Sequence, residues 1–387
     1  VTTLRRRRPR PLAVARRTAD TSIAPGCVLN AWVRSGSRSV VCLLAGALWV
    51  ALGTLSPVLA QAATTAGTGT FTNPIKARQG ADPWMLYYQG EYYLATTTWS
   101  SHLSMREAPT LAGLATAHDV IIWMGDAPTR CCNMWAPEFH LLDGPDGLHW
   151  YLYYVAGQDV HDYNPTQRLH VLESEGTDPM GPYHFKADLM PQRWALDPDI
   201  LKLNGTLYLL GTFMERGQDL FIAPLRDPWT LSGPPVVLSR PSLLWERFGA
   251  PVEEGPEALQ HDGNTFIVFS ASGCWTPNYA LGLLTYRGGD PLDPESWLKA
   301  PEPVFQSDNA IGVFAPGHNG FFTSPDGAQD WIVYHANSSP LGGCDNNRST
   351  RAQPFAWRPD GTPDFGAPIR LGVPLEEPSG TVDDALP

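Results

Sequence analysis

The chain has 387 residues and a formal net charge of −12, and its composition is 43% hydrophobic, 11% aromatic and 17% charged. So many apolar and aromatic residues with so few charges exclude intrinsic disorder. The acidic balance argues against a nucleic acid partner, because affinity for phosphate backbones comes mainly from Lys and Arg. The 37 prolines and 36 glycines interrupt the chain too often for long helices. We therefore expect an all-β protein.

The first 62 residues have the composition of a signal peptide. They carry nine arginines and one acid, and an apolar run over residues 40–55 is followed by Ala60-Gln61-Ala62. This order is typical of secretory export, whereas a membrane-spanning helix needs about 20 apolar residues. We predict a signal peptide over residues 1–62, with an uncleaved anchor helix as the alternative. The basic part is long and begins with Val1, so we expect the true start codon further along. The mature protein should be secreted or periplasmic and free of the membrane.

Four cysteines follow this segment: Cys131, Cys132, Cys274 and Cys344. Export places them in an oxidising compartment, and their even number allows three pairings. Their spacing matches no zinc motif. We expect structural disulfides or buried thiols, and the sequence leaves the pairing open.

A turn followed by an aromatic and β-branched run recurs five times. The turn dipeptides are Gln89-Gly90, Asp146-Gly147, Asn204-Gly205, Asp262-Gly263 and Asp326-Gly327. Such dipeptides favour the positive φ of hairpin turns, and the runs that follow begin 57 to 65 residues apart. This period fits one four-stranded propeller blade, whereas a β-sandwich or a parallel β-helix would repeat on a shorter unit. We predict a single five-bladed β-propeller over residues 70–375.

A polar residue lies 10 to 13 positions before each repeated strand, at Asp82, Glu138, Asp197, Glu254 and His318. These positions fall on the strand before the hairpin, which lines the central channel of a propeller. An isolated Asp-Pro is usually an ordinary turn, but five residues in phase should converge on one point. Like charges brought together repel and raise a pKa, so structure alone gives no reason for the cluster. Converging carboxylates beside tryptophans suit a glycosidase, and Trp135 is the tryptophan that we expect to bind the sugar.

At these residues the sequence resembles glycoside hydrolase family 43, in particular its secreted arabinan-degrading α-L-arabinofuranosidases. The resemblance spans roughly residues 72–372 and is carried by the ordered set Ala-Asp-Pro-Trp (81–84), Trp-Ala-Pro-Glu (135–138), Leu-Asp (196–197), Glu-Gly-Pro (254–256), Gly-His-Asn (317–319) and Thr-Arg-Ala-Gln (350–353).

The resemblance implies an inverting hydrolase that needs no cofactor for its chemistry. Asp82 would be the general base, Glu254 the general acid, and Asp197 would hold Glu254 and raise its pKa. Arg351 would contact a sugar hydroxyl or orient the acid. His318 matches a histidine that often binds calcium or another ion through water. The expected substrates are plant cell-wall oligo- or polysaccharides, with release of terminal α-L-arabinofuranose from arabinan or arabinoxylan side chains.

Some features depart from the family pattern or leave alternatives. Asp197 and Asp199 are both acids, and strand alternation would point both the same way, although the family pattern selects Asp197. A vicinal disulfide between Cys131 and Cys132 would shape the substrate mouth, and pairing of these cysteines with Cys274 or Cys344 is the alternative. A β-xylosidase of the same family would use the same residues. A non-catalytic carbohydrate-binding propeller would have lost one of the three carboxylates, and a retaining fructan hydrolase would show motifs that this chain lacks.

Overall fold

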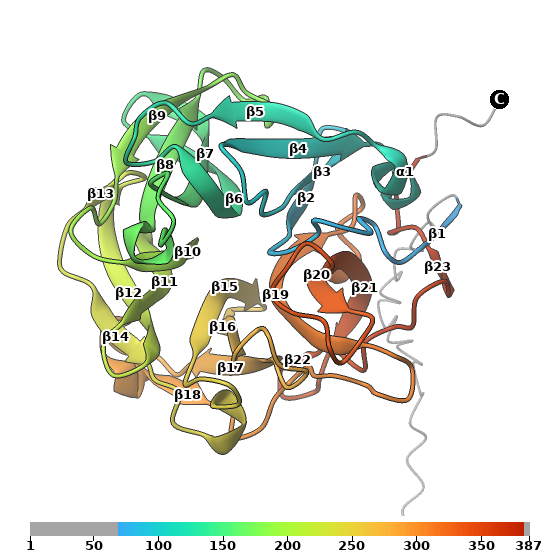
Figure 1. Ribbon diagram of the computed structural model, residues 1–387. Coiled ribbons are helices and arrows are strands. Elements are labelled where there is room, and N and C mark those ends of the chain that lie inside the picture. The colour runs from blue at the N-terminus through green and yellow to red at the C-terminus, as the bar shows by residue number, and fades with distance from the viewer. Residues whose placement is uncertain (1–68, 383–387) are drawn as a thin grey trace, which may run out of the picture. The chain divides into compact units, whose positions relative to one another are not determined.

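The computed structural model describes residues 69–382, and the expected signal peptide over residues 1–62 lies outside them. Within the described residues, five antiparallel sheets follow one another in chain order and stand around a common centre (Figure 1). Each sheet has four strands along its hydrogen-bonded path, and the third sheet carries one strand more. The prediction of an all-β, five-bladed propeller is therefore confirmed.

The strands of each blade have the following bounds. Blade 1 contains β2 (Trp84–Tyr88), β3 (Glu91–Ala95), β4 (His102–Ala108) and β5 (Val120–Met124). Blade 2 contains β6 (Cys132–Gly144), β7 (Gly147–Gly157), β8 (Arg168–Ser174) and β9 (Tyr183–Asp188). Blade 3 contains β10 (Ala195–Leu203), β11 (Thr206–Met214), β12 (Gln218–Asp227) and β13 (Thr230–Leu231), with β14 (Val236–Ser239) paired to β12. Blade 4 contains β15 (Glu253–His261), β16 (Asn264–Ala271), β17 (Ala280–Tyr286) and β18 (Trp297–Lys299). Blade 5 contains β19 (Phe314–Thr323), β20 (Asp330–Asn337), β21 (Ser349–Trp357) and β22 (Pro363–Asp364).

The hairpin turns between the first two strands lie where the sequence predicts them. In blades 1, 3 and 4 both residues of the turn have positive φ, as in Asn204 (52°) and Gly205 (79°). Right-twisted strands favour this turn because its own twist matches theirs. The Asn-Gly and Asp-Gly turns therefore end the first strand of the blade, and their recurrence gives the blade period.

The core lies between the blades rather than inside any one of them. Residues 151–156 of β7 are fully buried on both faces of the sheet, which explains why the repeated strands are continuous apolar and aromatic runs. Each hydrophobic cluster combines residues of two neighbouring blades, and one cluster fills each of the five interfaces. Burial between blades leaves the rims and the channel free to carry polar groups.

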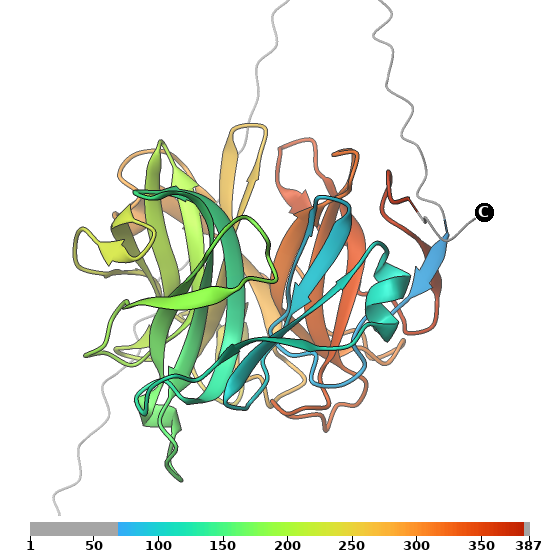
Figure 2. The same cartoon turned by 90° about the horizontal axis from the view of Figure 1, so that it is seen from above.

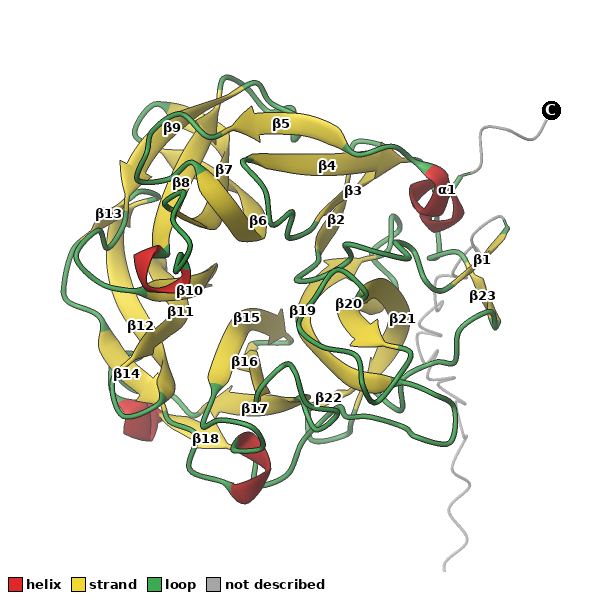
Figure 3. Ribbon diagram, viewed as in Figure 1, coloured by secondary structure: helices red, strands yellow, loops and turns green. Residues whose placement is uncertain are grey.

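Helices are few in the described residues (Figure 3): α1 (Leu111–Thr116) and the short 3₁₀ turns η1 (Asn164–Thr166), η2 (Leu244–Glu246) and η3 (Pro294–Ser296). None of them is long and apolar enough to span a membrane.

A two-stranded sheet of β1 (Thr70–Thr72) and β23 (Pro374–Glu376) lies at the outer edge of the ring (Figures 1 and 2). Next to it, the carboxylate of Glu377 accepts hydrogen bonds from the backbone N–H groups of Leu111 and Ala112, both at 2.9 Å. An anion at a helix N-terminus satisfies donors that have no intrahelical partner. The C-terminal strand is thus joined both to β1 and to α1.

Candidate active site

A residue with positive φ interrupts the inner strand of every blade, in or just before its first strand. These residues are Asp82 (53°), Ala136 (42°), Asp197 (55°), Gly255 (53°) and His318 (46°). In blades 2 to 5 the strand register shifts here, which marks a β-bulge. Such a conformation costs a non-glycine residue about 1–3 kcal/mol and is found mainly at functional sites. The repeated acid–proline pairs are therefore explained by bulges that direct side chains into the channel.

Because of the bulges, the carboxylates that reach the cavity differ from those that the sequence spacing alone predicts. Glu138 lies two residues beyond Ala136, the bulge residue of its blade, so the expectation that Glu138 joins the others at the pocket mouth is wrong. It does not line the cavity that holds Asp82, and its carboxyl contacts Asp199 instead. The bulge at Asp197 likewise breaks strand alternation, so Asp197 lines the cavity whereas Asp199 does not.

Asp82 is surrounded by hydrogen-bonding and cationic groups. Arg348 Nη1 lies 3.0 Å from its Oδ1, and the Thr97 hydroxyl donates to its Oδ2 at 2.5 Å. The Nδ1 atoms of His318 and His335 each lie 3.3 Å from Oδ1. Burial alone would raise the pKa of Asp82, but the charge of Arg348, helped by the two histidines, outweighs burial and holds this pKa well below its usual value. Asp82 is therefore an ionised carboxylate.

Asp197 and Glu254 form a carboxyl pair of the opposite character. Asp197 Oδ2 accepts the backbone N–H of the residue after Glu254 at 3.0 Å. Glu254 accepts hydrogen bonds from the Tyr279 hydroxyl at 2.8 Å and the Gln218 amide at 2.7 Å. Burial raises the pKa of both carboxyls, and repulsion from Glu254 raises the pKa of Asp197 further. Interacting acids of this kind titrate as a unit, so the pair still holds a proton at a pH where Asp82 is ionised.

Asp82, Asp197 and Glu254 line one cavity of about 270 Å³. Its walls also carry five aromatic side chains, those of Trp99, Trp135, Tyr163, Trp194 and Trp275. Trp135 packs with its ring centre 5.1 Å from that of Trp99 and 5.9 Å from that of Tyr163. Flat aromatic faces beside carboxyl groups suit a sugar ring, so the structure brings Trp135 and the three carboxylates together as the sequence predicts.

The cysteines pair as Cys131–Cys132 and Cys274–Cys344. Cys274 follows β16 and Cys344 lies between β20 and β21, so this disulfide joins blades 4 and 5. It also lines the cavity, next to Trp275. The vicinal pair lies outside the cavity lining, at the start of the strand that carries Trp135.

Arg351 is not where the sequence predicts it. It is fully buried in β21, where its guanidinium donates to Ser349 and Ser338, and it does not line the cavity. The arginine at the cavity is Arg348, just before β21, and it pairs with Asp82. The sequence signal was weak, because Arg348 lies in a loop segment outside the repeated pattern. Thr97 and Tyr279 also lie outside the named strands, whereas Gln218 begins β12 and His335 lies in β20; none of these four was predicted from the sequence.

The surroundings of His318 do not fit a directly bound cation. Its Nδ1 lies 3.3 Å from Asp82 Oδ1, which Arg348 already pairs, so a cation there would meet the guanidinium charge. Among the residues that the structure describes, the His and carboxylate side chains close enough to share an ion lie elsewhere, in blades 2 and 3. The geometry therefore disfavours a direct bond between His318 Nδ1 and an ion, and an ion bound through water stays a prediction.

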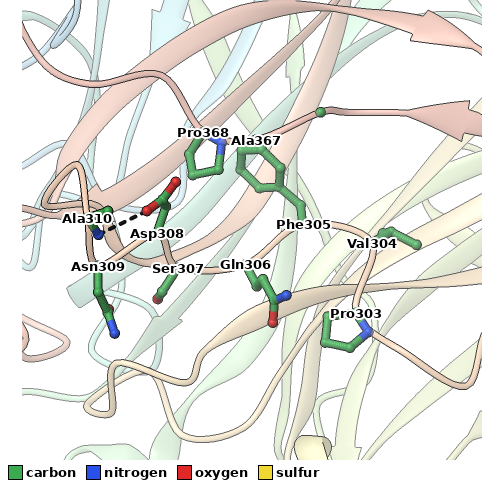
Figure 4. A pocket seen from close by; sticks show the side chains of 11 residues that line it. Pro303, Val304, Phe305, Gln306, Ser307, Asp308, Asn309, Ala310, Ala367 and Pro368 are labelled. Atoms are coloured by element: carbon green, nitrogen blue, oxygen red, sulfur yellow. Dashed lines mark hydrogen bonds between the residues drawn. The ribbon is translucent and has the colours of Figure 1, made fainter.

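A second hollow lies between residues 303–310 and 366–368 (Figure 4). Of the described residues that line it, Asp308 alone is ionisable, and its carboxylate accepts a hydrogen bond from the Ala310 backbone N–H at 3.0 Å. General acid–base hydrolysis needs two ionisable groups, so this hollow is not the catalytic cavity.

An ionised carboxylate facing a carboxyl pair that keeps its proton, all beside aromatic walls, suits cleavage of a glycosidic bond. The protein is a glycoside hydrolase built on a five-bladed propeller. Residues 71–363 match the model of glycosyl hydrolases family 43, and the chain belongs to that family.

The relatives of this chain carry consistent names. It is 37% identical over 353 residues to the extracellular exo-α-(1→5)-L-arabinofuranosidase of Streptomyces avermitilis, across 87% of this chain and 71% of that protein. It is 38% identical over 312 residues to α-L-arabinofuranosidase 43 of Humicola insolens, across 76% of this chain and 63% of that protein. The crystal structure of an α-L-arabinofuranosidase from Lactobacillus brevis is similar with a TM-score of 0.71 and 34% identity, over 78% of this chain and 98% of that one.

Proposed function

We propose that the protein is an inverting α-L-arabinofuranosidase that releases terminal arabinofuranose from arabinan or arabinoxylan side chains. The observation that carries the proposal is the contrast within one cavity between Asp82, which is ionised, and the Asp197–Glu254 pair, which keeps a proton. A glycosidase needs this division, since one carboxyl must accept a proton while another donates one.

Asp82 acts as the general base. It takes a proton from a water molecule as that water attacks the anomeric carbon, and Arg348 and Thr97 hold the carboxylate in place. Glu254 acts as the general acid and gives its proton to the leaving glycosidic oxygen. Direct attack by water inverts the configuration at the anomeric carbon. No cofactor takes part, because both proton transfers use carboxyl groups.

Asp197 positions Glu254. Its Oδ2 accepts the backbone N–H of Gly255, directly after the acid, at 3.0 Å. Burial and the charge of Asp82 raise the pKa of Glu254, which favours the protonated form that a general acid needs near its operating pH. Tyr279 and Gln218 hold the two carboxyl oxygens of Glu254 and so fix its direction.

The substrate assignment is supported by the names of the relatives. The Streptomyces avermitilis relative is named for exo action on α-(1→5)-linked L-arabinofuranose and the Humicola insolens relative as an α-L-arabinofuranosidase. A cavity of about 270 Å³ has room for one terminal sugar ring rather than a long chain. The word extracellular in the name of that relative also supports the export that the sequence led us to expect.

Asp82→Asn and Glu254→Gln test the two roles. Each should lower kcat for an aryl α-L-arabinofuranoside by about 10²–10⁴-fold, because each removes one proton transfer. Azide should rescue Asp82→Ala and give a glycosyl azide of inverted configuration. Glu253→Gln is the matched control, because this neighbour is buried and pairs with Lys299 away from the cavity. Near-normal turnover in either of the first two variants would contradict the assigned role. A panel of aryl arabinosides, aryl xylosides and linear arabinan tests the substrate assignment. Faster hydrolysis of the xylosides would assign the enzyme as a β-xylosidase instead.

A further inference from the structure

A second group of ionisable side chains lies one step further along the inner strands. Glu138 and His140 of β6 and Asp199 of β10 place one ligand atom each within 4.8 Å of one another. His140 Nε2 lies 3.4 Å from Glu138 Oε2 and 3.5 Å from Asp199 Oδ1. Glu257 of β15 reaches the same group, since its carboxyl contacts that of Glu138. Blades 2, 3 and 4 therefore meet at this cluster.

The three carboxyls of this group have no cationic partner in the described part of the chain. Glu138, Asp199 and Glu257 are 3%, 1% and 1% exposed, and among residues 69–382 no Lys or Arg pairs with any of them. Buried carboxylates without a cation are costly, and a metal ion is one means of neutralising them.

Two further observations point to a bound cation. Glu257 Oε2 is buried and has no hydrogen-bond partner, whereas buried polar atoms are nearly always paired. The separations of 3.4 and 3.5 Å around His140 exceed a good N–H···O hydrogen bond. They equal the spacing of about 3.3–3.6 Å between two ligands that each lie about 2.0–2.2 Å from a tetrahedral zinc ion. The backbone N–H of Ala258 holds Asp199 Oδ2 at 2.8 Å, which directs the other oxygen toward His140.

We propose that Glu138, His140 and Asp199, completed by Glu257, bind one divalent metal ion that joins blades 2, 3 and 4 at the propeller centre. An imidazole nitrogen together with carboxylate oxygens suits Zn²⁺ or Mn²⁺. The ion is structural, because its ligands lie outside the catalytic cavity. It is also distinct from an ion at His318.

Metal analysis of the full-length enzyme is the first test. After chelation, adding Zn²⁺ or Mn²⁺ should restore about one metal per chain and raise the melting temperature, because a ligand that binds only the folded state stabilises it. Binding should release protons, since the carboxyls must ionise to act as ligands. A chelated enzyme that takes up neither ion and whose melting temperature does not change would overturn the proposal.

Conservative variants locate the site. Glu138→Gln and Glu257→Gln should each weaken metal binding by at least about ten-fold. Glu173→Gln is the matched control, because Glu173 is buried in β8 but pairs with Lys186. Full affinity in both cluster variants, or equal loss in the control, would contradict the assignment.

Crystals of the wild-type enzyme grown with Zn²⁺ provide a test that needs no variant to fold. An anomalous difference peak within bonding distance of His140 Nε2 and Asp199 Oδ1 is expected. The absence of a peak at this position would overturn the proposal, whether or not another peak lies beside His318.

Discussion

Replacing Arg348 with methionine should move the acid limb of the pH–rate profile upward. Arg348 Nη1 lies 3.0 Å from Asp82 Oδ1, and both side chains are largely buried. A nearby opposite charge lowers an Asp pKa by about 1–3 units, so its loss should raise the pKa of Asp82 by about 2 units, which corresponds to about 3 kcal/mol. Activity requires ionised Asp82 and is lost as the pH falls through this pKa. The variant should therefore lose activity at a pH about 2 units higher than the wild type does.

The assay is kcat/KM for an aryl α-L-arabinofuranoside as a function of pH. Arg348→Lys is the matched control, because it keeps the charge and should keep the acid limb close to that of the wild type. Stability follows the same sign. A depressed folded-state pKa stabilises the fold above the unfolded pKa of Asp, and this contribution is lost as the pH falls through the folded pKa. Coincident acid limbs in Arg348→Met and the wild type would refute the view that Arg348 keeps Asp82 ionised.

Three further changes have defined outcomes. Tyr279→Phe removes the donor to Glu254, so the pKa of the carboxyl pair should rise and the alkaline limb should move upward; an unmoved limb would contradict this. Cys274→Ser with Cys344→Ser removes a link across 70 residues and should cost about 2–4 kcal/mol in urea unfolding; unchanged stability would argue against the role of this bond. Thr97→Val leaves Asp82 Oδ2 and the backbone N–H of Ala136 without the hydroxyl that both contact. The free energy of unfolding should fall by about 1–3 kcal/mol, whereas Thr97→Ser should retain most of the stability.

The fold could be predicted because its signals are local and repeated. Both residues of the turn dipeptide adopt positive φ in blades 1, 3 and 4, and the glycine does so in blades 2 and 5. The buried runs that follow these turns are apolar on both faces. Five copies at one period correspond to five blades. What remained for the tertiary structure was the packing of the five blades into a closed ring.

The site was predicted in part, because strand geometry is regular until a bulge interrupts it. Asp197 sits on a bulge, Glu254 lies beside one, and Asp82 has the same positive φ just before β2, so all three reach the cavity. Glu138 has the same approximate spacing in sequence but lies two residues past its bulge. Spacing counted from the hairpin cannot reveal such an offset, because a bulge adds a residue without changing the hydrophobic pattern.

The sequence by itself determined the blade number, the three cavity carboxylates and the tryptophan beside them. Each of these features lies in a short motif that has its own conformational preference. Only the tertiary structure decided which arginine faces Asp82, which cysteines pair and which acids gather around His140. Those contacts join segments as distant as residues 82 and 348, and they depend on how the ring closes. The way the ring closes depends on the packing at all five blade interfaces together. No local sequence motif carries that information.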